Sequence, residues 1–538
     1  YGRHGITTKS TVGRPGTPTN EWVTLDCSIW RYHPVTKKFE TVCRGTTNPW
    51  GLDWDENGQA FFSNNVIGHF WHVIPGAFYK RMFGSHDNSH LYELMESCSD
   101  HLHWQGAKWS EARGGPAHDA LGGGHSHCGL MIYQGDNFPP EWRGRAFMGN
   151  IHGNRVLYDV PSRHGSGYTA KHGGNFLLAD DLWFRSTAQY YGPDGGVFVT
   201  DWNDLGECHD NDGSYRSSGR IYKVTYGDVK PQPNLNLARL SDAELIKLLG
   251  HANEWQRRHA QRLLQERAVA GKLDKATVPS LLKLHAAEKD GPKQLRLLWA
   301  LHVTGGADEK FLTAQLDHAS EHARWWAIRL LTEEQKVTPA LLARFVTLAR
   351  EDKSAFVRLG LSSALQRLPV NDRWDLATGC LAALVDTAPD AEVIVVANGS
   401  VPPTGLPGDP TVIRYADNVG FAKGCNAGAT GLLSFFAASI FARVSAWRSV
   451  MLLTSDCWAA MLTSICCMSR ARLRSISFSV VNESSSARSL RFSSARCCSS
   501  CFFFSASACC ALRCSALNEP SPWSTIWPRL LSALAALS

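Results

Sequence analysis

Several histidines and an arginine stand close together in a glycine-rich stretch, and side chains of these types can move protons and bind anions. The stretch reads GGGHSHCGLMIYQGDNFPPEWRGRAFMGNIHGNRV and contains His125, His127, His152 and Arg155, with His118 just before it. Histidine suits a general base because its unperturbed pKa lies near neutrality. A planar guanidinium suits carboxylates and carbonyls. We therefore expect His125 or His127 to be the base and Arg155 to bind an anionic group.

Another interpretation of these residues is purely structural. The histidines would then form hydrogen bonds between neighbouring sheets, and Arg155 would pair with a nearby aspartate.

An acidic stretch follows about fifty residues later and offers oxygen ligands for a cation. The phrase Asp210-Asn-Asp-Gly resembles the front of a calcium loop, although the twelve-residue spacing with its closing glutamate is absent. The predicted metal ligands are Asp204, Glu207, Asp210 and Asp212. A solvated acidic turn is the alternative.

Short β-branched and aromatic runs surround both stretches and must position them. In NPWGLDWDENGQAFFSNN, two strands flank a tight turn at Asp55-Glu-Asn-Gly58, where Asn57 and Gly58 favour the positive φ of a two-residue loop. QYYGPDGGVFVTDW repeats the phrase with its turn at 193–196. Recurrence of one hairpin phrase predicts radially repeated sheets, which means a β-propeller. Two unrelated hairpins are the alternative.

These phrases also carry a family resemblance. Together with HVIPGAFYKR and GRIYKVTY, they resemble the membrane-bound dehydrogenase-like proteins of planctomycete-type bacteria, within the soluble quinoprotein glucose/sorbosone dehydrogenase superfamily. The resemblance covers residues 1–230 and implies the later part of a propeller from a longer protein. It implies pyrroloquinoline quinone and calcium as cofactors, a sugar or related alcohol as substrate, and a periplasmic or cell-envelope location. The cofactor-binding residues would be His152, Asn154, Arg155 and Arg220.

Other histidines and tryptophans carry no recognisable ligand spacing. We expect His86, His90, His101 and His103 to be surface or packing residues. Trp109, Trp142 and Trp183 are expected in the propeller core rather than as ligand platforms.

Residues 237–370 change to Leu, Ala, Arg, Glu and Lys at helical spacing. Ser241-Asp-Ala-Glu244 predicts a capping box at a helix start. An arginine opens an apolar helix at intervals of 28–39 residues, namely Arg257, Arg296, Arg324 and Arg358. The period resembles HEAT repeats stacked as a solenoid. We expect these arginines to bond to neighbouring repeats; binding a partner protein is the alternative role.

Residues 376–430 indicate a short α/β fragment that resembles the first βαβ unit of family 2 glycosyltransferases. Val396-Ala-Asn-Gly-Ser400 stands where that family has its Asp-Asn-Gly-Ser phrase, and Asn418-Val-Gly-Phe-Ala422 matches a later phrase. Ala397 occupies the acidic position, and no metal-binding Asp-x-Asp follows. We expect a severed fragment that does not transfer sugars.

The final stretch, residues 431–538, is dominated by Ser, Ala, Leu, Arg and Cys and has only three acidic residues. Charges interrupt its apolar runs before they reach the length of a membrane span. Out-of-frame translation is the simplest explanation, and a membrane-associating tail is the alternative. The net charge of +6 is small for 538 residues and gives no case for nucleic-acid binding.

The sequence thus predicts a multidomain chain: a partial β-propeller, an α-solenoid, a truncated α/β fragment and a tail. We expect a quinone-dependent oxidoreductase acting on sugars or related alcohols. A non-catalytic propeller whose helical repeats dock a protein partner is a second hypothesis, and a glycosyltransferase-derived fragment is a third.

Overall fold

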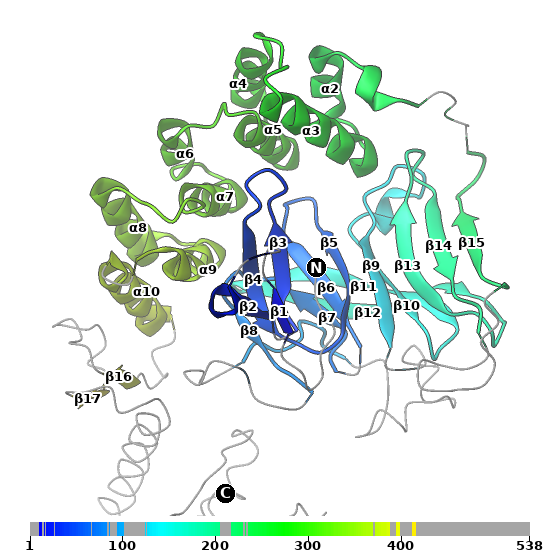
Figure 1. Cartoon of the computed structure of the whole chain (residues 1–538), viewed down its shortest axis with the longest axis horizontal. Helices are drawn as coiled ribbons and strands as arrows, with labels where there is room; N and C mark the ends of the chain where they lie inside the picture. Colours follow the sequence, from blue (N-terminus) through cyan, green and yellow to red (C-terminus); the bar gives the residue numbers. More distant parts are fainter. Residues whose placement is uncertain are drawn as a thin grey trace, which may run out of the picture. The chain divides into compact units, whose positions relative to one another are not determined.

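Among the described residues of the computed structural model, strands β1 to β15 precede helices α2 to α10, and strands β16 and β17 follow them (Figure 1). The residues described are 10–12, 16, 18–25, 27–65, 67–82, 86, 94–101, 124, 126–204, 217–229, 232, 235–369, 372–387, 394–398 and 411–415. All of them belong to one compact unit, Tyr1–Ala442, and the second unit, Arg443–Ser538, lies outside them.

Six small sheets are formed by the described strands, with orders β1-β2, β3-β4-β8, β5-β6-β7, β12-β11-β10-β9, β13-β14-β15 and β16-β17. The first eight strands are β1 (Ser10–Val12), β2 (Val23–Leu25), β3 (Ile29–Tyr32), β4 (Phe39–Gly45), β5 (Pro49–Trp54), β6 (Ala60–Asn64), β7 (Phe70–His72) and β8 (Phe78–Tyr79). The next seven are β9 (His127–Ile132), β10 (Ala146–Asn150), β11 (Arg155–His164), β12 (Gly167–Leu178), β13 (Ser186–Tyr191), β14 (Val197–Asp201) and β15 (Arg220–Val224).

The two hairpins predicted from the repeated phrase are confirmed, and their turns share one geometry. In the first, the Gly58 amide donates to Asp55 O (3.1 Å) and the Asp55 amide to Gln59 O (2.9 Å). In the second, Gly195 donates to Gly192 O (3.0 Å) and Gly192 to Gly196 O (2.8 Å). Only the glycine has positive φ in each turn, 72° and 77°. The prediction of a two-residue loop is therefore wrong: each loop is a turn closed by one left-handed glycine.

Neighbouring sheets approach so closely that glycine is required where their strands meet. A Cβ on Gly51 of β5 would lie 2.2 Å from the Leu130 amide nitrogen of β9, and one on Gly129 would lie 2.6 Å from Ala188 Cα of β13. The described strands form separate small sheets, and their arrangement as the blades of a propeller stays a prediction.

The helices begin after a short 3-10 turn at 237–239 and follow the predicted helical segment. They are α2 (Asp242–Leu248), α3 (Glu254–Val269), α4 (Thr277–Ala287), α5 (Gly291–Val303), α6 (Glu309–Gln315), α7 (Glu321–Leu331), α8 (Pro339–Glu351), α9 (Ala355–Ala364) and α10 (Trp374–Thr387). The capping box predicted at Ser241 and Glu244 is confirmed. Among the described helices, none combines the length and apolar character needed to cross a bilayer.

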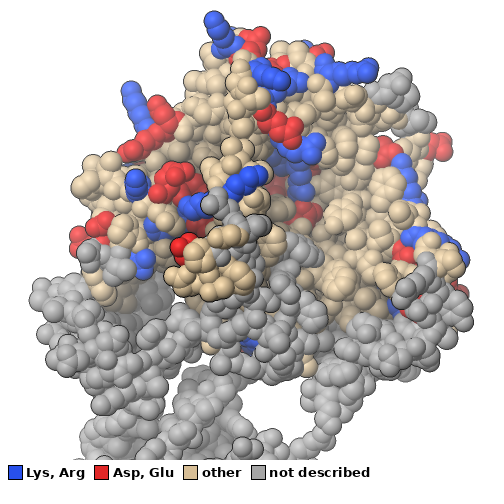
Figure 2. All heavy atoms as spheres, in the orientation of Figure 1, with Lys and Arg blue, Asp and Glu red and all other residues tan. Residues whose placement is uncertain are grey.

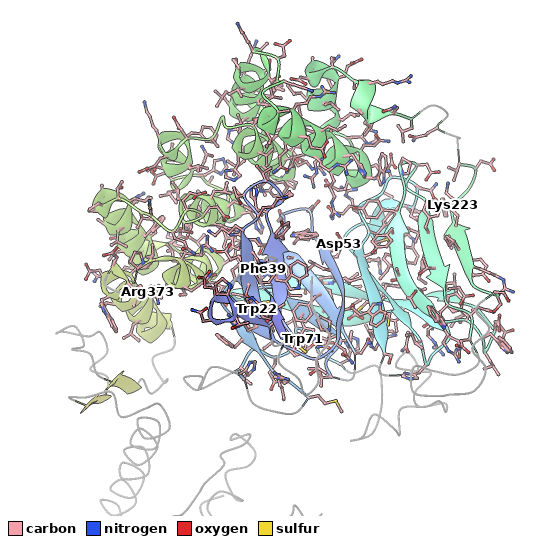
Figure 3. The ribbon with its side chains drawn as sticks, viewed as in Figure 1. Trp22, Phe39, Asp53, Trp71, Lys223 and Arg373 are labelled. Carbon is pink, nitrogen blue, oxygen red and sulfur yellow. The ribbon has the colours of Figure 1, made fainter. Side chains whose placement is uncertain are left out.

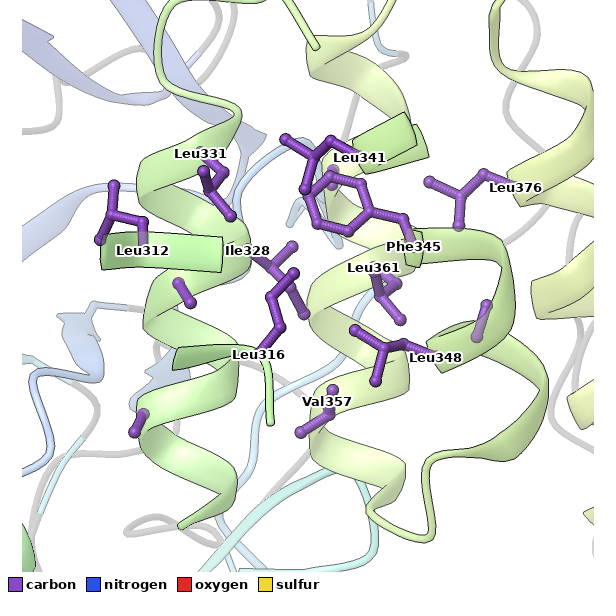
Figure 4. Packing of buried hydrophobic residues seen from close by; sticks show 14 of the residues in the cluster. Leu312, Leu316, Ile328, Leu331, Leu341, Phe345, Leu348, Val357, Leu361 and Leu376 are labelled. Atoms are coloured by element: carbon purple, nitrogen blue, oxygen red, sulfur yellow. The ribbon is translucent and has the colours of Figure 1, made fainter. Parts of the chain in front are cut away.

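Apolar side chains from successive helices form one continuous cluster (Figure 4). Phe345 of α8 is fully buried between Ile328 of α7 and Leu361 of α9, and Leu376 brings α10 into the same cluster. Each helix buries its apolar stripe against its neighbours, because no single helix can cover its own. The packing of successive helices in one apolar cluster is observed, whereas their assignment to HEAT repeats remains a prediction.

The four recurring arginines all bond within the helical segment. Arg257 and Arg296 both pair with the buried Glu254. Arg324 forms two bonds with Asp352, at 2.7 and 2.9 Å, and Arg358 donates to the Asp352 carbonyl (2.5 Å). The structural role that the sequence indicated agrees with these contacts.

Three helices also contact the turn-bearing ends of the sheets. Arg258 of α3 donates to Asp53 Oδ1 (2.7 Å), and the Trp326 indole of α7 donates to Asn57 O (2.8 Å). Asp53 is labelled in Figure 3 near the end of β5 that these helices approach. Farther along the chain, Ser363 of α9 donates to Pro75 O (2.6 Å).

Acidic and basic side chains are intermixed over the helices, on the face seen in Figure 2. Beyond α10, β16 (Ile394–Asn398) and β17 (Thr411–Tyr415) pair in parallel, as a βαβ-type unit would require. The later phrase at 418–422 lies outside the described residues.

Candidate metal centre

Four histidines and an aspartate from distant parts of the chain form one cluster between two sheets. We call His69, His101, His127, His172 and Asp159 the histidine cluster. His69 precedes β7, His127 opens β9, and Asp159 and His172 are register partners on β11 and β12.

A short extended stretch carries His101 into this cluster. Residues 97–101, the bridging segment, run between β7 and β12. The Cys98 amide donates to Phe70 O (3.0 Å), and the Ala170 amide donates to Cys98 O (2.8 Å). Two residues after Cys98, the Asp100 amide donates to Ala170 O (3.1 Å). Backbone bonds on both sides therefore fix the position of the following histidine.

Strand alternation places the Asp159 carboxyl on an apolar face. Side chains at alternate positions of a strand share a face, and the Leu157 side chain on this face packs against Phe70 and Ala170. Asp159 is completely buried, so its carboxyl needs polar partners. His69 and His101 supply them.

The ligand atoms of His69, His101 and Asp159 all lie within 4.8 Å of one another. His69 Nε2 lies 2.8 Å from Asp159 Oδ2, and His101 Nε2 lies 3.4 Å from Asp159 Oδ1. Two ligands of one tetrahedral zinc ion are about 3.4 Å apart, given metal–ligand bonds near 2.1 Å. The separations in the cluster bracket this value, so small side-chain movements would bring the three side chains to the spacing of ligands of a single ion.

Hydrogen bonds orient both imidazoles. Asp100 Oδ1 lies 2.9 Å from His101 Nδ1, so this carboxylate holds the proton on Nδ1 and leaves Nε2 to face Asp159. Ser99 Oγ lies 3.1 Å from His69 Nε2. The His127 ring packs 4.8 Å from the His69 ring, and the His172 ring lies 5.5 Å from the His101 ring.

The two outer imidazoles have opposite pKa shifts. Burial disfavours the charged form of His101, but the bonds and charges of Asp159 and Asp100 outweigh it and raise the pKa. Burial lowers the pKa of His172, and the positive charges of His101, His69 and Arg155 lower it further, against the opposing effect of Asp159. In the metal-free protein, His172 is therefore neutral and His101 charged at pH values that lie between their two pKa values.

Some predicted site residues lie at or beside this cluster. His127 belongs to it and is completely buried. Arg155 is close enough to influence His172, while its Nε donates to Gly153 O (2.8 Å) and its Nη1 to Asn175 Oδ1 (3.5 Å). His152 lies against Gly124, where an added Cβ would be 2.4 Å from the histidine Cβ. His125 lies outside the described residues.

Other predicted residues make contacts elsewhere. The Asn154 amide donates to Leu182 O (2.9 Å) and Phe184 O (3.0 Å), which fastens the β12–β13 connection. Arg220 of β15 lies 3.9 Å from Asp201, its neighbour on β14. The Trp202 indole donates to Asp204 Oδ2 (3.2 Å). Glu207, Asp210 and Asp212 lie outside the described residues.

The histidine cluster does not suit calcium, whose predicted ligands Glu207, Asp210 and Asp212 lie outside the described residues; calcium and quinone binding stay predictions. Calcium prefers six to eight oxygen ligands, whereas the histidine cluster offers imidazole nitrogens and one carboxylate. Among the predicted quinone ligands, Asn154 uses its amide on two carbonyls and Arg220 belongs to a different sheet from Arg155. The donor set instead suits zinc or another divalent transition metal.

Sequence reasoning missed His69 and Asp159 and misjudged His101, which was expected at the surface or in packing. Asp159 did carry a signal, because it interrupts the apolar run RVLYDV of a strand. His86, by contrast, plays the expected packing role: its Nε2 lies 3.0 Å from Tyr79 O. His90 and His103 lie outside the described residues.

Residues 1–228 match the model of a family described as a domain of unknown function, DUF7133. Among solved structures, the chain is similar to a putative oxidoreductase (glucose dehydrogenase) from Thermus thermophilus. The identity is 18% and the TM-score 0.23, over 34% of this chain and 47% of that one. A second structure, a glucose dehydrogenase, shows 19% identity and a TM-score of 0.22, over 36% and 49%.

The chain thus spans about half the length of the solved structures it matches. At these TM-scores the likeness carries no argument about function. No curated protein matches the chain.

Proposed function

We propose that the sheet-forming part of the chain is a metal-dependent oxidoreductase domain in which His69, His101 and Asp159 bind one divalent transition-metal ion. The observation that carries the proposal is the mutual spacing of their ligand atoms, all within 4.8 Å. The substrate class, the alcohol group of a sugar or related compound, rests on the sequence resemblance of the phrases between Asn48 and Tyr226.

A metal ion bound here would act as a Lewis acid and lower the pKa of a coordinated hydroxyl group. The protein's own residues prepare this chemistry in two ways. Asp100 fixes the His101 tautomer, and Asp159 supplies the negative charge that offsets the cation. Burial and nearby positive charge lower the pKa of His172 and favour its neutral form. This weak base would accept the hydroxyl proton because metal coordination would make that hydroxyl group more acidic.

Oxidation of the alcohol also requires an acceptor for two electrons. The resemblance favours a quinone-class acceptor, and we keep that cofactor as a proposal without assigning residues to it. The hydride leaves the carbinol carbon and the proton leaves its hydroxyl, so the product is a carbonyl compound.

Metal binding by the full chain tests the centre directly. After chelator treatment and dialysis, the protein is titrated with Zn²⁺, Co²⁺ and Ca²⁺, and the bound metal is measured by elemental analysis and by Co²⁺ visible absorption. We expect about one transition-metal ion per chain and no displacement by Ca²⁺. His101→Gln should weaken binding at least 10-fold, and Asp100→Asn about 10-fold, as for outer-shell partners elsewhere.

His164→Gln is the matched control, because His164 is an exposed residue at the far end of β11, the strand that carries Asp159. Equal binding by wild type and His101→Gln, or displacement of the metal by Ca²⁺, would contradict the metal centre. Activity is assayed separately, as aldose-dependent reduction of a dye. Activity that survives chelation would overturn the metal-dependent reaction and leave the binding result standing.

A further inference from the structure

A second candidate site lies between the β5–β6 turn and three helices, apart from the histidine cluster. It is a cavity of about 310 Å³, within the size range of small-molecule pockets, roughly 300–1,000 Å³. Its lining includes Trp54, Asp55 and Gly58 from the strands and turn, and residues of α3, α5 and α7.

Helical spacing explains why these side chains converge. Residues three or four apart share a face of a helix. Arg257 and Gln261 form such a pair on α3, Trp299 and Val303 on α5, and Trp326 and Leu330 on α7. One face from each of three helices therefore borders the cavity.

Three indole rings give the cavity flat apolar surfaces. Trp299 and Trp326 pack edge to face with their centroids 5.2 Å apart, and Trp54 is 42% exposed. The turn comes close to two of these rings, because a Cβ on Gly58 would lie 2.6 Å from Trp299 and 2.7 Å from Trp326.

Three carboxylates balance the three guanidinium groups at and behind this wall. Arg258 pairs with Asp53 at 2.7 Å, and Arg257 shares Glu254 with Arg296. Asp55 adds a third carboxylate to the lining. A ligand therefore need not bring a negative charge to neutralise any of these guanidinium groups, and a neutral ligand is favoured over an anion.

A hydrogen-bond donor remains at the cavity wall. Gln261 lines the cavity, and its Oε1 accepts from Arg257 Nη1 (2.6 Å), which leaves the Gln261 amide NH₂ as a donor for a ligand. The Trp299 Nε1 atom is itself buried, so Trp299 offers its ring rather than its N–H. A ligand hydroxyl oxygen would accept from the Gln261 amide.

We infer that this cavity binds a neutral saccharide, with a pyranose ring against the indoles and a hydroxyl group on the Gln261 amide. Aromatic faces suit the apolar C–H faces of such a ring, and the N–H donors suit its oxygens. This binding site is separate from the proposed metal centre and requires no metal.

The test uses the full chain after chelator treatment, with glucose, galactose, xylose, maltose and cellobiose as probes and gluconate as the charged comparison. Saturation-transfer NMR and tryptophan fluorescence report binding. We expect at least one neutral sugar to bind, with gluconate no tighter than glucose. Gln261→Leu keeps the size of the side chain but removes the NH₂ donor, and should weaken binding about 3- to 10-fold, the worth of one neutral hydrogen bond.

Gln265→Leu is the matched control, since Gln265 lies one turn along α3, is exposed and does not line the cavity. Val303→Phe should fill the cavity and abolish binding, and an unchanged melting temperature shows that the variant is folded. Three results would overturn the inference: no neutral sugar binding, equal weakening by Gln261→Leu and Gln265→Leu, or tighter binding of gluconate than of glucose. None of them depends on the metal titration.

Discussion

Burial raises the pKa of Asp55 to about 6, against the hydrogen bonds that the carboxyl accepts from the Gln59 amide, the Tyr168 hydroxyl and the Asn57 amide. The unfolded chain should titrate near 3.9. Between these values the folded state holds more protons than the unfolded state, so the free energy of unfolding falls as pH rises from about 4 to about 6.

Asp55→Asn should remove this contribution while keeping the acceptor for both backbone amides. Between pH 4 and 6, the free energy of unfolding of wild type should fall relative to that of the variant by at most about 3 kcal/mol. Above pH 6 the difference between the two proteins should stay constant. Urea unfolding at several pH values measures the difference. Asp317→Asn, at a side chain 67% exposed, serves as control. Parallel pH profiles for wild type and Asp55→Asn would show that the carboxyl titrates normally.

Individual site residues were only partly predictable. His127 could be found because glycine, histidine and strand patterning coincide in one short phrase. His69 and Asp159 could not, because their pairing is a contact between side chains 90 residues apart. Nothing in local spacing reports such a contact. The assignment of His101 failed for the same reason, since its partner lies on β11.

At the scale of elements, the link between α3 and α5 depends on one carboxylate. Glu254 is 2% exposed and pairs with Arg257 on its own helix and with Arg296 on α5, which is itself buried. These partners lower the pKa of the Glu254 carboxyl, against the opposing effect of burial. The Glu254 carboxylate is therefore ionised and enclosed between the Arg257 and Arg296 guanidinium groups.

Glu254→Gln should destabilise the protein by about 3–5 kcal/mol, because it leaves two guanidinium groups without their buried counter-charge. Glu266→Gln, twelve residues along the same helix, removes one side of an exposed pair with Arg262 and should cost about 0–1 kcal/mol. Denaturant midpoints of the two variants give the comparison. Similar losses for both would mean that Glu254 contributes only as a surface charge does.

Elements themselves were more predictable than their contacts. Alternation and turn residues located β5, β6, β13 and β14, and helical spacing located α2 to α9. The sequence failed on loop geometry, because Asn-Gly is compatible with several turns and the pairing of the flanking strands selects among them. Whether the sheets close into a ring depends on contacts between sheets, which no strand pattern contains.

Over the whole molecule, the helices and sheets are joined through buried polar groups. Asp53 is 6% exposed, and it accepts from Arg258 on α3 and, at 2.8 Å, from the Ile132 amide on β9. One carboxylate thus connects a helix to two strands of different sheets.

Arg258→Ala should cost about 1.5–3 kcal/mol, the worth of a hydrogen bond to a charged group. Since the pair spans helices and sheets, far-ultraviolet circular dichroism and tryptophan fluorescence should shift to the same lower urea midpoint. Arg262→Ala, one turn along α3 and exposed, should leave the midpoint unchanged within error. A shift in one signal alone would show that helices and sheets unfold independently.

The bridging segment has a consequence for the order of folding. It pairs with β7 on one side and β12 on the other, so it cannot settle until both strands exist. On a ribosome, β7 and the bridging segment emerge well before β12 is synthesised, and closing so long a loop is slow compared with forming a local hairpin. The centre is thus assembled only after β12 has emerged, and a metal ion captured there would report that the sheets on either side have already formed.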